Sequence, residues 1–300
     1  MSNPLKVSIV IRCLNEFENL NVLFPLLKRQ TYNNFEIIFV DSGSTDGSLE
    51  YVKELKKSKY LDINILKIKK ENFTFGRSLN IGFREAQGEI VISLSAHCFP
   101  TSNLWIDNYL ASFKKSDKIG IVYGRQIAHK MTKYSEQSVL TKLFGEKSGF
   151  QNHSFNNNGN SATLKSLWTQ KNFDEDLSGL EDIDFAKFIL ENDYKIFYST
   201  DTSVEHYHDE TYKQIKNRYK REAFALKIIY PDKVISLFGL ISMFIKDLNF
   251  DLRNRKNSKL VNGKKLSDIF RYRLNQFLGT YIGFKKNIDH EFDKRYFYLR

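Results

Sequence analysis

The sequence contains only two cysteines and four prolines, and it has no segment of low complexity. Cys13 and Cys98 both lie in apolar stretches typical of strands, where a free cysteine packs as a small apolar side chain. These residues therefore predict buried thiols in a reducing compartment, and not a fold held by disulfides. The scarcity of proline and of repetitive segments excludes a long disordered chain.

A long apolar run is also absent. The longest one near the C-terminus spans residues 234–245, whereas a membrane-spanning helix needs about 20 apolar residues. The first residues lack a basic segment followed by an apolar one, so no targeting signal is predicted. Hydrophobic residues make up 41% and charged residues 27%, as in ordinary globular proteins. We expect a cytoplasmic protein, either free or bound to the inner face of the cytoplasmic membrane.

Acidic residues are scarce in the last third of the chain. Residues 207–300 hold 21 Lys or Arg and 10 Asp or Glu, whereas residues 1–206 hold 25 of each kind. The net charge of +11 therefore comes entirely from the C-terminal part. This asymmetry predicts either an anionic partner or a solvated basic face. A zinc spacing, an RNP-like motif and a helix-turn-helix pattern are all missing, so nucleic acid is not an expected partner.

Apolar runs and amphipathic segments alternate along the first 200 residues. We expect buried strands at 6–15, 35–41, 63–70, 89–96, 118–126 and 195–208, and helices at 16–30, 48–58, 78–88, 102–116 and 180–193. This order predicts a doubly wound α/β sheet that binds ligands at the carboxyl ends of its strands. Gly88 is the expected residue after the third helix, and residues 131–172 are expected to be polar and irregular. The pattern is mainly helical from about residue 210.

Polar residues directly follow several of the expected strands: Asn15, Glu16, Asp41, Ser42 and the loop of Ser95, Ala96 and His97. A carboxylate such as Asp41 can accept hydrogen bonds from a base imide or a ribose hydroxyl, and the following Gly and Ser residues let backbone N–H groups approach an anion. The alternative is a plain turn that caps the helix at Ser48.

Six segments occur in an order that resembles the family 2 glycosyltransferases with the GT-A fold, in particular bacterial polysaccharide or rhamnosyltransferase-like members. They are residues 7–16, 35–48, 76–100, 156–168, 173–189 and 204–208. The resemblance covers roughly residues 5–215. It implies a Rossmann-like α/β fold with a mixed, mainly parallel sheet flanked by helices. We expect this domain at residues 1–208, and a basic, aromatic-rich helical region at residues 209–300.

The same resemblance implies roles for individual residues. In the donor site it places Asn15, Glu16, Asp41, Ser42, Arg77, Asn80, Ser95, Ala96, His97 and Arg221, and in the acceptor site Asn158, Asn160 and Gln126. Asp182 is the implied catalytic base, and Glu181 the residue that shapes the acceptor pocket. Acids in the first turn of a helix are also favoured by the helix dipole alone. Arg218 and Arg221 suit either a diphosphate or a solvated helix, and Arg125 is a weaker candidate.

The family chemistry explains these residue types. Direct displacement at the anomeric carbon inverts its configuration, needs one base for the acceptor hydroxyl, and needs positive charge at the departing diphosphate. Family members normally carry Asp-x-Asp where this chain has Ser95-Ala96-His97. Ser95 can still bond a ribose hydroxyl. His97 and His206, with His208 close by in sequence, suit Mn²⁺ better than Mg²⁺.

Three interpretations of this loop stay open. The two histidines hold a metal, or the enzyme is independent of metal and uses histidine and basic side chains, or His97 is simply packed. The lack of carboxylates favours the second slightly. The sequence thus predicts an inverting transferase that moves a sugar from a UDP- or dTDP-sugar to a glycan or lipid-linked glycan in the synthesis of capsule, lipopolysaccharide or another surface polysaccharide. The alternative is a non-catalytic scaffold in such an assembly. The basic region predicts contact with an anionic membrane, or a homodimer.

Overall fold

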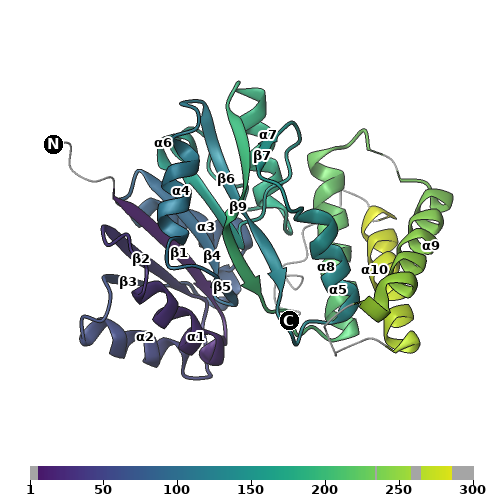
Figure 1. Ribbon diagram of the computed structural model, residues 1–300, viewed down its shortest axis with the longest axis horizontal. Coiled ribbons are helices and arrows are strands. Elements are labelled where there is room, and N and C mark those ends of the chain that lie inside the picture. Colours follow the sequence, from purple (N-terminus) through teal and green to yellow (C-terminus); the bar gives the residue numbers. More distant parts are fainter. Residues whose placement is uncertain (1–5, 234, 258–264, 286–300) are drawn as a thin grey trace. The chain divides into compact units, whose positions relative to one another are not determined.

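The computed structural model describes residues 6–233, 235–257 and 265–285 (Figure 1). The chain forms two compact units. The first lies within Met1–Ile127, Phe144–Glu175 and Glu181–His206, and the second within Ala128–Leu143, Asp176–Leu180 and Tyr207–Arg300. The units are therefore not two successive segments, because residues 128–143 belong with the C-terminal helices. The domain boundary expected between residues 208 and 209 stays a prediction.

The first half of the sheet is parallel. Strand β1 (Val7–Cys13) lies between β2 (Phe35–Asp41) and β4 (Ile90–Ser95), and β2 also pairs with β3 (Ile63–Lys67). Helices α1 (Phe17–Lys28), α2 (Ser48–Lys57) and α3 (Phe75–Glu85) connect these strands. Nearly every residue of β1, β2 and β4 is buried, which explains their continuous apolar runs.

The second half of the sheet contains antiparallel pairs. Strand β8 (Asn160–Leu164) runs antiparallel to both β4 and β6 (Ile119–Ala128). Beyond β6 come β9 (Lys195–His206) and β5 (Cys98–Pro100), and β7 (Gly149–Gln151) pairs with β9. Helices α4 (Trp105–Phe113), α6 (Lys165–Gln170) and α7 (Glu181–Glu191) and the 3₁₀ turn η1 (Lys70–Asn72) complete the unit. The predicted α/β fold with a mixed sheet is confirmed.

The expectation that residues 131–172 are irregular is wrong. They contain α5 (Tyr134–Leu143), β7, β8 and α6. Strand β8 was not predicted because it is rich in polar residues, which in this protein are buried and hydrogen-bonded. Asn160, for example, accepts hydrogen bonds from Trp105 Nε1 at 3.2 Å and Tyr109 Oη at 2.8 Å. These partners lie 50 or more residues away, so the local pattern gave no sign of burial.

The role predicted for Gly88 is also wrong, because α3 ends at Glu85 and Ala86 caps it. Gly88 instead lies against β1. A Cβ atom on Gly88 would be 2.6 Å from Ser8 N and 2.8 Å from Lys6 O. The glycine is required by this close approach of two backbones and not by the end of the helix.

The two cysteines are free and buried, as predicted. Burial raises the pKa of the Cys13 thiol to about 12, which makes it unreactive at neutral pH.

The described part of the C-terminal region is mainly helical, as predicted, and it belongs to the second unit. Besides α5 this unit contains α8 (Tyr212–Ile229), α9 (Leu237–Asn254), the 3₁₀ turn η2 (Arg255–Asn257) and α10 (Leu266–Lys285). Thr211 begins α8 with a reciprocal capping box that includes Gln214. Across the described parts of the chain, no helix combines the length and the apolar character that a membrane crossing requires.

Buried ion pairs hold these helices together. Glu136 of α5 accepts hydrogen bonds from Arg218 at 2.7 Å and His208 at 3.3 Å, and from the hydroxyl of Tyr272. Burial alone would raise the pKa of Glu136, but Arg218 and His208 hold it well below its usual value. Arg218 also binds Glu210 at 2.8 Å. Arg218 and His208 are therefore engaged within this unit.

Candidate active site at the carboxyl edge of the sheet

The loop after β2 is organised around Asp41. Its buried carboxylate accepts hydrogen bonds from the backbone N–H of Gly43 at 3.1 Å and of Ser44 at 3.3 Å. Gly43 has a φ of +92°, which a residue with a side chain rarely adopts. Gly47 is the N-cap residue of α2, and Asp46 before it accepts from Ser48 N at 3.0 Å. Asp41 therefore shapes the loop itself and does not cap α2.

The loop after β1 is tied to this first loop. Asn15 has a φ of +56°, accepts a hydrogen bond from Thr45 N at 2.8 Å, and donates its own N–H to Ser44 Oγ at 3.0 Å. Since Cys13 and Asp41 are register partners in neighbouring strands, both loops leave the sheet at the same edge. Ser42 follows Asp41 directly and is also buried. The two loops therefore form one rigid corner of backbone and side-chain polar groups.

The Ser95–His97 loop meets this corner through Glu16. His97 Nδ1 lies 2.9 Å from Glu16 Oε1, and the second carboxylate oxygen of Glu16 accepts from Asn19 Nδ2 at 2.6 Å. Ala96 is buried, and the backbone N–H of Ser95 donates to Gly159 O at 3.1 Å. Because the carboxylate can only accept a hydrogen bond, His97 carries a proton on Nδ1 and donates it. The charge of the ring then depends on whether Nε2 is also protonated.

His206, at the end of β9, packs on His97. The two rings are stacked, with centroids 5.2 Å apart and an interplanar angle of 12°. His206 Nδ1 lies 2.6 Å from Gln126 Oε1, and Gln126 Nε2 donates to Asn157 Oδ1 at 2.9 Å. His206 therefore also donates from Nδ1. The structure brings the two predicted histidines together with ligand nitrogens within 4.8 Å.

Two buried acids begin α7. Asp182 accepts hydrogen bonds from the backbone N–H of Asn158 at 2.9 Å and of Ile183 at 2.9 Å. Glu181 lies 3.5 Å from Arg12 and 3.5 Å from Asn158 Nδ2. Burial first, and the neighbouring charge of Glu181 second, raise the pKa of Asp182 to about 7. An exposed acid at a helix start would not show such a shift, so the carboxyl group of Asp182 is able to exchange a proton near neutral pH.

Three predicted residues are engaged within the protein. Asn80 uses its whole amide: it donates to Phe173 O and Glu175, and it accepts from Trp168 Nε1 and Phe173 N. Asn160 is fully buried and, besides its bonds to the two aromatic residues of α4, donates to Thr202 O. Arg77 binds Glu175 at 2.7 Å, though its side chain is 38% exposed. We therefore keep Arg77 as a candidate, and assign Asn80 and Asn160 to the framework.

Two other predicted arginines have different surroundings. Arg125 pairs with Glu146 at 3.4 Å. Arg221 belongs to the second unit, where Ser178 Oγ donates to its backbone oxygen, and its role in the donor site stays a prediction.

Sequence reasoning missed Arg12, which lies within β1 and not after it. Its side chain lies over the ring of Phe75 at 5.4 Å and beside Glu181. Arg12 and Ser95 are register partners, so Arg12 lies at the edge of the sheet between the Ser95 loop and α7. A basic residue inside a buried strand was the available signal, because such a charge requires a partner.

The fold is shared with solved glycosyltransferases. A mannosyltransferase from Pyrobaculum calidifontis, in complex with GDP-Man and Mn²⁺, matches with a TM-score of 0.60 at 17% identity, over 89% of this chain and 74% of that chain. TarS of S. aureus, in complex with UDP-GlcNAc, matches with a TM-score of 0.57 at 14% identity, over 91% and 90%. The fold is therefore that of the GT-A glycosyltransferases.

The sequence identifies the family. Residues 8–170, more than half of the chain, match the family described as Glycosyl transferase family 2, and the chain belongs to this family. It is 25% identical to the O-antigen chain rhamnosyltransferase RfbN of Salmonella typhimurium over 72% of this chain and 70% of that protein. It is 41% identical to the cholesterol galactosyltransferase of Borreliella burgdorferi over 29% of this chain and 24% of that protein. The protein is thus a glycosyltransferase, as predicted.

Proposed function

We propose that this chain is an inverting transferase that moves a sugar from a UDP- or dTDP-sugar to a glycan or lipid-linked glycan during the synthesis of a surface polysaccharide. The observation that carries the proposal is the buried carboxyl group of Asp182, whose pKa is raised to about 7. The similarity of this chain to an O-antigen chain rhamnosyltransferase supports the choice of a polysaccharide pathway.

Asp182 acts as the general base in this mechanism. Its carboxylate takes the proton of an acceptor hydroxyl, whose oxygen attacks the anomeric carbon of the donor sugar. The bond from that carbon to the diphosphate breaks, and its electron pair leaves with the nucleoside diphosphate. Two backbone N–H groups fix the carboxylate. The base is therefore already oriented before the acceptor arrives.

The donor lies against the corner formed by the loops after β1, β2 and β4. Asp41, the last residue of β2, accepts a hydrogen bond from the base or the ribose of the nucleotide. Ser42 and Ser95 supply hydroxyl groups for further hydrogen bonds. The acceptor lies nearer to Asn158, whose backbone and side chain contact the acids of α7. Gln126 is held between His206 and Asn157, so it supports the histidine pair.

The histidine pair does not fit a single hard cation. An imidazole binds a metal along the lone pair in its ring plane, and two stacked rings at 12° direct their lone pairs along nearly parallel lines. The Ser95–His97 loop contributes no carboxylate, and Glu16, which lies beside it, is engaged by His97 and Asn19. Mg²⁺ and Mn²⁺ favour oxygen ligands. We therefore derive no step through a metal.

The two histidines instead act on the leaving group. With Nδ1–H of each ring bonded to a fixed acceptor, protonation at Nε2 gives an imidazolium with a second N–H group, and in His206 this Nε2 atom is buried. A diphosphate next to these atoms favours the protonated form and accepts a charge-assisted hydrogen bond from it. Imidazolium rings thereby supply the positive charge that the reaction needs as the diphosphate departs.

Substituting Asp182→Asn tests the function. The amide keeps the shape of the side chain but cannot take a proton, so we expect turnover to fall by roughly 10²–10⁴-fold while donor binding is retained. Transfer assays with a panel of nucleotide sugars, together with donor titrations, measure the two effects. The matched control is Asp184→Asn in the same helical turn, which removes a partly buried ion pair to Lys171 and leaves turnover within about twofold.

Transfer by Asp182→Asn at the rate of the unchanged protein would show that another group is the base. A non-catalytic scaffold is the second candidate, favoured by the replacement of Asp-x-Asp by Ser-Ala-His. Turnover with any donor of the panel excludes it.

A further inference from the structure

Helices α9 and α10 expose two apolar stripes. On α10, Leu266, Phe270, Leu274 and Leu278 recur every four residues, which places them on one side of the helix, and each is 42–55% exposed. On α9 the apolar residues that are 47–84% exposed are Leu237, Phe238, Ile241, Met243 and Ile245. Leu237, Ile241 and Ile245 recur every four residues and form the stripe with Phe238 beside them, whereas Met243 lies on another side of the helix. Aromatic and aliphatic side chains of this size are rarely left in water in such numbers without a binding partner.

The two stripes meet along the contact between the helices. Phe244 of α9 packs against Phe270 at 6.0 Å and Phe277 at 5.8 Å between ring centroids. Phe270 itself is 47% exposed, so it belongs both to this contact and to the outer surface. The exposed residues therefore form one continuous surface, called here the α9–α10 face.

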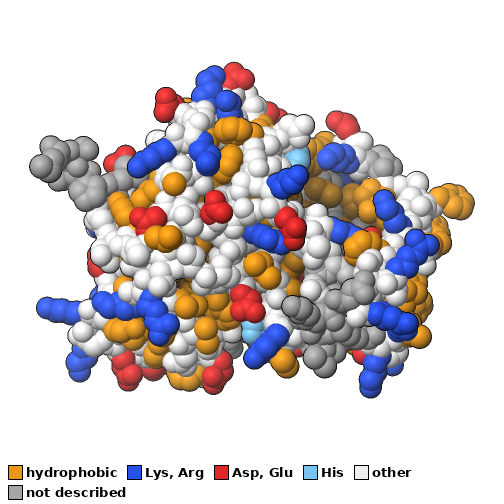
Figure 2. Space-filling view, viewed as in Figure 1, with side chains coloured by type: hydrophobic (Ala, Val, Ile, Leu, Met, Phe, Trp, Pro, Cys, Tyr) orange, Lys and Arg blue, Asp and Glu red, His pale blue; other side chains and the backbone are white. Residues whose placement is uncertain are grey.

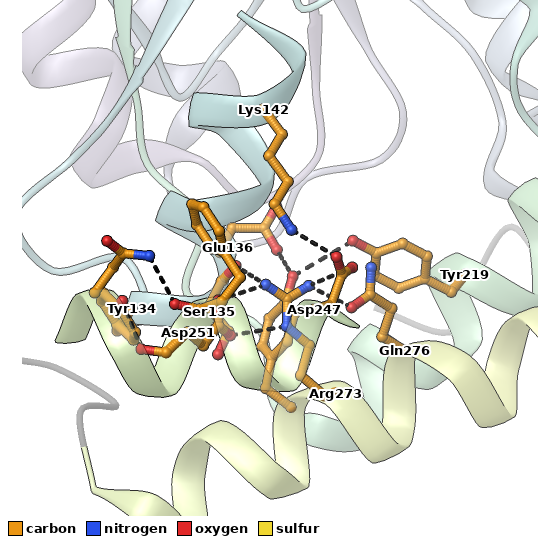
Figure 3. Close-up of polar contacts among 12 residues, drawn as sticks. Tyr134, Ser135, Glu136, Lys142, Tyr219, Asp247, Asp251, Arg273 and Gln276 are labelled. Carbon is orange, nitrogen blue, oxygen red and sulfur yellow. Dashed lines mark hydrogen bonds and ion pairs between the residues drawn. The ribbon is translucent and has the colours of Figure 1, made fainter. Parts of the chain in front are cut away.

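The acids of these two helices point inward. Asp251 is fully buried and forms a two-pronged ion pair with the buried Arg273, with both distances 2.8 Å (Figure 3). Asp247 pairs with Lys142 at 2.5 Å and with Arg273 at 3.3 Å. Asp268 accepts from the hydroxyl of Tyr212. Asp251 is buried and the other two are partly buried, so the carboxylates of α9 and α10 form their contacts within the second unit.

Apart from the buried Arg273 and the partly buried Arg255, the basic residues of the same segments are exposed. Within the described residues 237–285, the exposed charged side chains are Lys246, Arg253, Lys256, Lys265, Arg271 and Lys285, and all six are basic. Figure 2 shows blue and orange side chains side by side at its right, where Figure 1 shows α9, with almost no red. The α9–α10 face thus combines apolar and cationic groups.

We propose that the α9–α10 face binds the surface of an anionic lipid bilayer. Apolar side chains that enter the boundary between head groups and acyl chains, flanked by lysine and arginine at the head groups, are the features of helices that lie on a membrane. Each basic residue near such a surface adds about 1 kcal/mol of attraction. The face lies on the bilayer, since none of the helices in the described ranges qualifies as a membrane span.

The charge distribution decides between a membrane and a second copy of the chain. A two-fold dimer would place the same face against itself, so exposed basic residues would meet basic residues. No exposed carboxylate of the described parts of α9 or α10 is present to compensate. Like charges brought together in this way repel each other, whereas anionic head groups neutralise them. An anionic membrane is therefore the occupant that both properties of the face fit.

Vesicle co-sedimentation with the full chain tests the proposal and does not depend on activity. We expect binding to vesicles of phosphatidylcholine with phosphatidylglycerol, little binding to phosphatidylcholine alone, and release by high salt. Lys246→Gln with Arg271→Gln should weaken binding by about fivefold for each charge. Phe238→Ser with Leu274→Ser should weaken it by tenfold or more, because both side chains leave the apolar surface.

Matched controls come from exposed residues of the first unit. Lys57→Gln on α2 and Phe150→Ser on β7 make the same chemical changes elsewhere and should leave vesicle binding unchanged. Circular dichroism and thermal melting verify that each variant is folded. The proposal is overturned if the unchanged protein does not bind anionic vesicles, or if the face variants bind as well as the controls. It is also overturned if sedimentation equilibrium shows a dimer that the face variants dissociate.

Discussion

The carboxyl group of Asp182 is subject to opposing influences. Burial and the charge of Glu181 favour its neutral form, whereas two backbone N–H groups and the nearby Arg12 favour the anion. Burial and Glu181 dominate, and the pKa is raised to about 7. A proton acceptor with this pKa is about half ionised at neutral pH, where a base combines availability with driving force.

This shift predicts the pH dependence of the enzyme. Only the ionised form of Asp182 accepts a proton, so its ionisation should raise kcat/KM about tenfold per pH unit up to pH 7. The folded state also binds this proton more tightly than the unfolded chain. Its contribution to stability is therefore complete below about pH 4 and is lost as the pH rises through about 7. A pH–rate profile that is flat between pH 5 and 7 would contradict the assignment.

The same residues show how far the sequence can predict a site. Asp41, Asp182, His97 and His206 were predicted because they belong to short motifs, and the structure places each at the carboxyl edge of the sheet or beside it. The contact of His97 with Glu16 joins residues 81 positions apart, and that of His206 with Gln126 joins residues 80 apart. Only the folded sheet brings such pairs together, so the orientation of the rings could not be predicted.

At the scale of helices and strands, the local sequence pattern gave correct predictions where apolar residues dominate. Strands β1, β2 and β4 consist of nearly continuous apolar residues because both faces of the sheet are buried at these strands. The polar sequence of α5 did not predict a helix with buried residues. Its Glu136 is buried because Arg218 and Tyr272 reach it from helices more than 80 residues away. Tertiary partners of this kind leave no periodic signal in the sequence.

Glycines in the packing of α10 against α8 give a prediction about these elements. A Cβ atom on Gly279 would lie 2.3 Å from Lys216 O of α8, so the helices must separate to accept it. We expect Gly279→Ala to destabilise the protein by about 1–3 kcal/mol in chemical denaturation, although alanine favours helix. The control is Gly239→Ala in α9, where only the hydroxyl of Ser236 is near at 3.2 Å. That change should stabilise by about 0.5–1 kcal/mol. Equal effects of the two substitutions would contradict the close helix contact.

At the scale of the whole molecule, charge is separated along the chain. The basic excess lies in residues 207–300, and the residues proposed to bind the donor and to act as base, Arg221 apart, belong to the first unit, which has 22 Lys or Arg and 23 Asp or Glu. We therefore expect an anionic nucleotide to be bound by local groups and not by a general positive field. In this chain we assign that local charge to His97 and His206, since the loop between β4 and β5 has no carboxylates to hold a cation.

Thermal unfolding of the whole chain tests this assignment. A ligand that binds only the folded state stabilises it by about 2.7 kcal/mol at a hundred times its Kd, which raises Tm by several degrees. We expect UDP or dTDP to raise Tm equally in EDTA and in Mn²⁺. His97→Ala should abolish most of this shift but leave the shift with the free nucleoside unchanged, because the imidazole acts on the diphosphate. Asp41→Asn, at the proposed base and ribose contact, should reduce both shifts. If the diphosphate raised Tm only when Mn²⁺ is present, the charge would come from a metal, and the stacked histidines would have to rearrange to hold it.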